Sequence, residues 1–281
     1  MNTKKYFIAG VLMLAMSAPA TAQEVNYAEA LKPITAAIQA APNDPKAAKD
    51  LIKEYQKTFK KNEEAIVALG NVYLLQHNYA VATDIANSVV NNKKFNGSLG
   101  YVLLGDIAAL QDSIGNAGAA AQQYQTAISL DPQNVTAYER YAKVYRHVNS
   151  KVAVAKLEEL RKVKPDYPVE ATAAEIMLND GKYQEALAWD GKANPAYMTE
   201  DNFYNYGFAA YITKDYQKAL DVVKQGLQKF QNSEYLSRIA MMASVELKDY
   251  ASAVNYGKAV FAGTGKKVAN DYDVYSSTTR P

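Results

Sequence analysis

Few residues in this sequence could carry out catalysis or bind a metal. The chain of 281 residues holds two histidines, His77 and His147, and no cysteine. A protein metal site needs several His, Cys or carboxylate ligands at short spacing, and neither His-x-x-x-His nor Glu-x-x-His occurs. The lack of cysteine also excludes disulfides, a thiolate nucleophile and a cysteine-linked lipid. We therefore expect no metal site, and we expect each histidine at the C-terminal end of a helix, where the helix dipole favours it.

The motifs of nucleophilic and phosphate chemistry are missing too. The sequence contains no Gly-x-Ser-x-Gly and no glycine-rich phosphate loop. Carboxylates are numerous, but in helical proteins they usually form solvated faces, and Glu158-Glu159 is interpreted in that way. The sequence predicts a protein without a catalytic site and without a cofactor.

Aromatic side chains are the remaining candidates for binding. The chain has 22 tyrosines, and Tyr204, Phe208 and Tyr211 are spaced i, i+4, i+7, which places them on one side of a helix. Aromatic side chains supply a large contact area at a small cost in conformational entropy. These three residues either line a binding surface or fill the interior between helices, and the spacing fits both.

Composition and charge narrow the class of partner. Hydrophobic residues make up 49% and charged residues 21%, as in a globular chain, and 31 basic residues face 29 acidic ones. A near-neutral chain does not attract nucleic acid by net charge, so no nucleic-acid partner is expected.

The first 22 residues have the three parts of a secretory signal peptide. Lysines supply a positive start, residues 8–16 an apolar run, and Ala20-Thr21-Ala22 a small-x-small cleavage site before Gln23. The run is shorter than the roughly 20 residues of a transmembrane helix. We expect a periplasmic or secreted protein, with no lipid anchor and no membrane insertion in the mature form. Cleavage would remove two lysines, which leaves 29 basic and 29 acidic residues.

Repeats extend along nearly the whole mature chain. Tyr-x-x-Ala after a polar residue starts at Tyr27, Tyr79, Tyr183, Tyr216 and Tyr250, and alanines recur at steps of 34, 38, 33, 33, 33 and 34 residues. Glycines precede two of these alanines by twelve residues, at Gly70 and Gly207, and Gly105 precedes a third by a longer segment. These small residues are expected where helices cross closely: Ala48, Gly70, Ala82, Gly105, Ala120, Ala153, Ala186, Gly207, Ala219 and Ala253.

This pattern resembles the tetratricopeptide repeat (TPR) family. Leu69-Gly70-x-x-Tyr73 to Ala82 follows the family signature of a large residue, Leu-Gly, Tyr and Ala, and the segment from Tyr138 to Pro165 follows it again. Asp112-Ser113-Ile114 is similar to an O-glycosylation acceptor of exported Bacteroidetes proteins, and a plain glycine-rich loop is the alternative. Two positions depart from the TPR pattern: Asp190 replaces a large apolar residue and Met241 a small one.

The resemblance implies an all-α fold, a TPR α-solenoid in which antiparallel helix pairs form a right-handed superhelix. We expect about seven helix pairs over 23–262 and a C-terminal half-repeat or cap over 263–281. A non-repetitive helical bundle is the alternative fold, and a truncated repeat is the alternative for the tail. A cap is expected because a solenoid buries the apolar face of every unit against the next.

In TPR arrays the first helix of each pair lines a concave groove, which implies a set of candidate ligand contacts. These are Asn71, Asp106, Glu139, Lys143, Tyr204, Phe208, Tyr211 and Arg238. The resulting expectation is an exported, non-catalytic scaffold that binds a protein or peptide. The alternative is a glycan-binding accessory of an outer-membrane uptake system, in which tyrosines stack on sugar rings. An enzyme built on a helical scaffold ranks last, since no site supports it.

Overall fold

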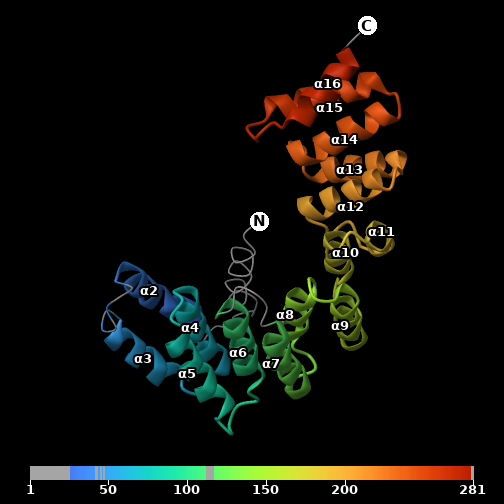
Figure 1. Cartoon of the computed structure of the whole chain (residues 1–281). Helices are drawn as coiled ribbons and strands as arrows, with labels where there is room; N and C mark the ends of the chain where they lie inside the picture. Colours follow the sequence, from blue (N-terminus) through green and yellow to red (C-terminus); the bar gives the residue numbers. More distant parts are fainter. Residues whose placement is uncertain (1–25, 42–43, 45, 47, 112–116, 280–281) are drawn as a thin grey trace. The chain divides into compact units, whose positions relative to one another are not determined.

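The computed structural model describes residues 26–41, 44, 46, 48–111 and 117–279, and all regular structure in these ranges is helical. The expected signal peptide and the acceptor-like segment Asp112-Ser113-Ile114 lie outside the described residues. Fifteen helices are described (Figure 1): α2 (Tyr27–Ala40), α3 (Lys49–Phe59), α4 (Glu63–Leu75), α5 (Tyr79–Val90), α6 (Ser98–Gln111), α7 (Ala117–Leu130), α8 (Val135–Tyr145), α9 (Ser150–Val163), α10 (Glu170–Asn179), α11 (Tyr183–Asp190), α12 (Glu200–Ile212), α13 (Tyr216–Lys229), α14 (Glu234–Glu246), α15 (Tyr250–Ala262) and α16 (Ala269–Thr279).

The chain divides into two units, and the boundary follows Val148. Unit 1 contains α2 to α8 and unit 2 contains α9 to α16. In each unit a helix packs against the next in sequence, and the even-numbered helices also pack against one another: α4 on α6 and α6 on α8 in unit 1, α10 on α12, α12 on α14 and α14 on α16 in unit 2. We call the even-numbered helices the first helices and the odd-numbered ones the second helices. The first helices form one layer in each unit, as in a solenoid.

The turn from a first to a second helix has the same construction in several pairs. The second residue after the first helix takes a left-handed backbone, with φ of 58° at His77, 65° at Lys214, 62° at Lys248 and 71° at Gly181. This conformation ends a helix because it lets the following N–H groups bond back to the last carbonyl groups. His77 follows α4 and His147 follows α8, so both histidines lie at helix ends, as predicted.

The next residue begins the second helix by capping it. The side chains of Asn78, Asp215 and Asp249 accept hydrogen bonds from backbone N–H groups three residues later. The tyrosine of Tyr-x-x-Ala is then the first helical residue and the alanine the fourth. The repeated cassette is therefore a helix start.

All ten small residues named above for the close crossings are buried, as that role requires. A Cβ atom on Gly70 would overlap the Leu103 side chain, and one on Gly207 would overlap Val223. Six of the seven alanines occupy the fourth position of a second helix, whereas Ala48 lies just before α3.

Carboxylates link neighbouring first helices at two places. Glu63, the first residue of α4, accepts hydrogen bonds from the N–H groups of Gly97 (3.4 Å) and Leu99 (3.2 Å) at the start of α6. Glu234, the first residue of α14, accepts one from the Gly265 N–H at 2.8 Å. The segment that leads into a first helix is thus hydrogen-bonded to the first residue of the preceding first helix.

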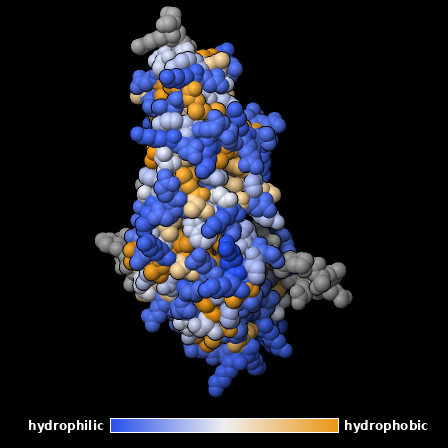
Figure 2. Space-filling view, turned by 90° about the vertical axis from the view of Figure 1, so that its right-hand side faces the viewer, coloured by the Kyte–Doolittle hydropathy of each residue, from blue (hydrophilic) through white to orange (hydrophobic). Residues whose placement is uncertain are grey.

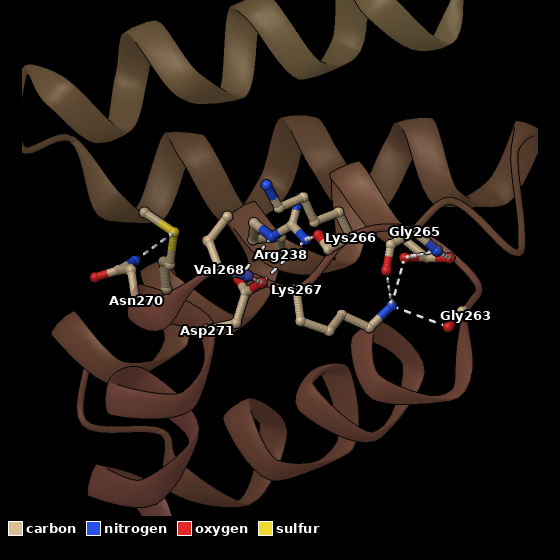
Figure 3. A network of polar contacts seen from close by, with 10 residues as sticks. Arg238, Gly263, Gly265, Lys266, Lys267, Val268, Asn270 and Asp271 are labelled. Carbon is tan, nitrogen blue, oxygen red and sulfur yellow. Dashed lines mark hydrogen bonds and ion pairs between the residues drawn. The ribbon is translucent and has the colours of Figure 1, made fainter.

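The tail predicted as a half-repeat contains α16, which packs on α14 and α15. Figure 3 shows how Arg238 of α14 faces Asp271 of α16: Nε donates to Oδ1 at 2.6 Å and Nη2 to Oδ2 at 3.1 Å. Asp271 is fully buried, whereas Asn270, Asp273 and Ser277 face solvent. Such a polar outer side is what a terminal helix of a solenoid requires.

We expect Asp271→Ala to lower the free energy of unfolding of unit 2 by about 2 kcal/mol, because Arg238 would lose its buried anion. Thermal unfolding followed by circular dichroism measures this change. Asp273→Ala, an exposed change on the same helix, serves as the control. Deletion of Lys266–Pro281 should lower the melting temperature further, because it also removes the Tyr275 ring that packs against Gly257. An unchanged melting temperature would rule out a capping role for the tail.

Candidate binding surface

Asp106, predicted as a groove contact, lies in the interior of unit 1, and that prediction is wrong. Its side chain is buried between α6, α7 and α8, where the Tyr124 hydroxyl donates to Oδ1 at 2.8 Å and Arg140 Nε lies 3.4 Å from the same oxygen. The reason is Gly105: without a side chain there, the Tyr124 ring packs on the α6 backbone and its hydroxyl reaches Asp106.

The electrostatics of this cluster indicate a structural role. Burial raises the pKa of Asp106, and Arg140, Tyr124 and Lys143 oppose that rise. Burial, followed by the charge of Asp106, raises the pKa of Tyr124 well above its ordinary value. A buried ion pair of this kind holds neighbouring helices in register and has no surface to offer a ligand.

The other candidates of unit 1 are partly covered. Asn71 on α4 is half-buried, and its Oδ1 atom is buried without a hydrogen-bond partner among the described residues. Glu139 and Lys143 on α8 are half-buried as well. Their role as ligand contacts stays a prediction.

Unit 2 exposes a group of aromatic side chains on its first helices. Tyr204 and Phe208 of α12 stack with ring centroids 6.1 Å apart and planes 10° apart, and Tyr235 of α14 meets Tyr204 edge-on at 6.1 Å. Tyr235 is 57% exposed. Met242, two turns further along α14, is half-buried. We call Tyr204, Phe208, Tyr235 and Met242 the aromatic face.

Tyr204 and Phe208 fit both predicted roles, since each helps to fill the interior and also lines the surface. One side of each packs on the core cluster that contains Phe203, Val223 and Ile239, and each keeps part of its surface in solvent. The repeat spacing did not predict Tyr235 as a contact. The candidate contacts were chosen at steps of about 34 residues, and Tyr235 lies only 31 residues after Tyr204. A search of whole helix faces instead of equivalent positions would have included it.

Two predicted contacts are used inside the unit. The Tyr211 ring lies 5.4 Å from that of Tyr216 on α13, and burial, then the Glu246 carboxylate, raises its pKa. Arg238 is committed to Asp271. Both side chains therefore contact other helices of the unit: Tyr211 contacts α13, and the Arg238 guanidinium group binds α16.

The rest of the described surface offers little chemistry. An open hollow of about 590 Å³ at the start of α4 is lined by Thr58, Phe59, Lys61, Asn62, Glu63, Glu64 and Leu99. Over the residues described, no three His, Cys, Asp or Glu side chains are grouped as a metal site would need. No helix in those ranges combines the length and the apolar character needed to cross a bilayer. On the face in Figure 2, hydrophobic residues form small groups among hydrophilic ones.

Comparisons with known proteins give a fold and no close relative. No family model and no curated protein matches the sequence. Among solved structures, the APC/C hetero-tetramer Cut9-Hcn1 matches with a TM-score of 0.50 at 13% identity over 97% of this chain. The chain spans 55% of the length of that structure's chain.

Two bacterial structures match less closely. Pseudomonas aeruginosa pilF has a TM-score of 0.48 at 19% identity, over 64% of this chain and 88% of its own. A tetratricopeptide repeat protein from Parabacteroides merdae has a TM-score of 0.46 at 12% identity, over 100% of both chains. At these identities the matches speak to fold alone. Together with the helix pairs stacked within each unit, the match to Cut9-Hcn1 confirms the predicted all-α solenoid of helix pairs.

Proposed function

We propose that this chain is an exported, non-catalytic TPR scaffold that binds a protein segment on the aromatic face of unit 2. The main observation in support of this proposal is the exposure of Tyr235. This large aromatic side chain is 57% exposed and lies beside the stacked pair Tyr204 and Phe208. Grouped aromatic residues that keep exposed surface are typical anchors of protein interfaces. The non-catalytic part rests on the lack of catalytic motifs in the sequence, and the exported part on residues 1–22.

Photo-crosslinking in living cells tests this function. We expect a photoreactive phenylalanine analogue at position 235 to form one dominant protein adduct under ultraviolet light. The same analogue at Tyr197, which is 68% exposed in the turn before α12, is the control and should form none. The adduct is expected in the periplasmic or secreted fraction, with Gln23 as the first residue of the scaffold.

Three results would contradict the proposal. Equal adducts at 197 and 235 would mean that the aromatic face is not the contact. A cytoplasmic adduct with an uncleaved N-terminus would refute export. No protein adduct, combined with glycan-array binding that Tyr235→Ala abolishes, would favour the glycan-binding accessory instead.

A further inference from the structure

Charges in unit 2 are divided between the two layers of helices. The first helices α10, α12, α14 and α16 contain one basic residue, Arg238, and eight acidic ones: Glu170, Glu175, Glu200, Asp201, Glu234, Glu246, Asp271 and Asp273. The second helices α9, α11, α13 and α15 contain eight basic residues and five acidic ones. In unit 1 the first helices hold three basic and five acidic residues, so this strong division belongs to unit 2.

Most of this acidity is not neutralised within the unit. Ion pairs account for Glu170 with Arg161, Glu234 with Lys267 and Asp271 with Arg238. The remaining five have no Lys, Arg or His within ion-pair distance in the part of the chain that the structure describes: Glu175, Glu200, Asp201, Glu246 and Asp273. Four of these are exposed, and Glu200 is half-buried.

The exposed carboxylates border the aromatic face. Glu175 on α10 has the position in its repeat that Phe208 on α12 has in the next one, 33 residues later, and the two helices pack together. Asp201 lies one turn before Tyr204 on α12. Glu246 ends α14, the helix that carries Tyr235 and Met242. Arg238, the one basic residue of these four helices, is already bound by Asp271, so it does not pair with the exposed carboxylates.

We infer that the aromatic face binds a protein segment in which Lys or Arg side chains alternate with apolar ones. This inference rests on the proposed function and specifies its partner. A cation placed against Tyr204, Phe208 or Tyr235 gains cation–π attraction from the ring face. The bordering carboxylates attract the same cation, and apolar side chains of the partner cover the rings and Met242. An acidic segment, a nucleic acid or an anionic membrane would be repelled by this layer.

A displayed library of random 15-residue peptides tests the partner's chemistry. The purified full chain is the target. Peptides that also bind the double variant Tyr204→Ala with Tyr235→Ala are discarded, because they bind elsewhere. Tyr197→Ala with Tyr250→Ala, two exposed tyrosines outside the first helices, is the matched control. Circular dichroism verifies that each variant is folded. We expect the surviving peptides to be enriched in Lys and Arg next to apolar residues and to bind the control variant unchanged.

Single peptides from this selection then test the charges. Glu175→Lys with Asp201→Lys should weaken binding at least ten-fold, whereas Glu185→Lys, an exposed change on second helix α11, should leave it within two-fold. Raising NaCl from 50 to 300 mM should weaken binding at least three-fold, because salt screens exposed charges.

The possible failures are distinguishable. Peptides that depend on Tyr204 and Tyr235 but are neutral or acidic would overturn the inference and leave the proposed function standing. If no peptide depends on these tyrosines, both fail. Basic peptides that are insensitive to Glu175 and Asp201 would overturn the role given to the carboxylates.

Discussion

Replacement of Asp106 by alanine is expected to lower the free energy of unfolding of unit 1 by about 3–5 kcal/mol, the range for breaking a buried ion pair. The variant would leave the Arg140 guanidinium at 5% exposure without its anion. It would also remove the acceptor of the buried Tyr124 hydroxyl. Urea unfolding followed by circular dichroism measures the loss.

Two further variants separate charge from packing at this site. Asp106→Asn keeps an acceptor for Tyr124 and should lose less than the alanine variant. Asp106→Leu with Arg140→Met replaces the pair by apolar side chains and should recover most of the stability, because the buried charge is removed together with its partner. An Asp106→Ala variant within about 1 kcal/mol of the parent would show that the pair contributes little.

Asp190→Asn is expected to stabilise unit 2 at pH 8 by about 2–4 kcal/mol and to have little effect near pH 4. Asp190 is 4% exposed, and burial raises its pKa from 3.8 to about 7. It is also the last residue of α11, where the helix dipole disfavours a negative charge.

The direction of this pH dependence follows from the difference between the pKa of Asp190 in the folded and in the unfolded chain. Since the folded-state pKa lies above the unfolded value, the stability that Asp190 contributes is fully present below about pH 4 and is lost as the pH rises through about 7. At pH 8 the folded chain buries a carboxylate that the unfolded chain would leave in water. An uncharged side chain avoids this cost.

Unfolding free energies of the parent and Asp190→Asn, measured between pH 4 and pH 9, test this dependence. Asp201→Asn, an exposed acid on α12, is the control and should show no such pH-dependent gain. A gain that is equal at pH 4 and pH 8, or a loss at pH 8, would contradict a buried, raised-pKa carboxyl at this position.

The sequence predicted the repeat architecture well because six of the seven second helices bury an alanine at the same position. An alanine at the fourth position of a second helix is buried in pair after pair, so its spacing carries the fold. The sequence also marked Asp190 as a departure, and burial in the structure explains why that departure is costly.

The binding surface was predicted less well, because equivalent positions do not have equal surroundings. Asp106 and Phe208 occupy the same position in their repeats, but Tyr124 covers the first, whereas the second keeps part of its surface in solvent. Arg238 is not available as a ligand contact because it binds Asp271, 33 residues later. Asp271 lies in the tail, where the repeat pattern is incomplete. The face of a helix can be read from its period; the depth to which its neighbours cover it cannot.

The carboxylates at the start of α4 and α14 have a consequence for amide hydrogen exchange. The Gly265 N–H is bonded to Glu234 at 2.8 Å and the Leu99 N–H to Glu63 at 3.2 Å, so each amide loses its acceptor when the earlier helix frays. The exchange rates of these two amides therefore report the opening of the preceding repeat as well as of their own. Two backbone positions thus give a direct measurement of how strongly one repeat depends on the next.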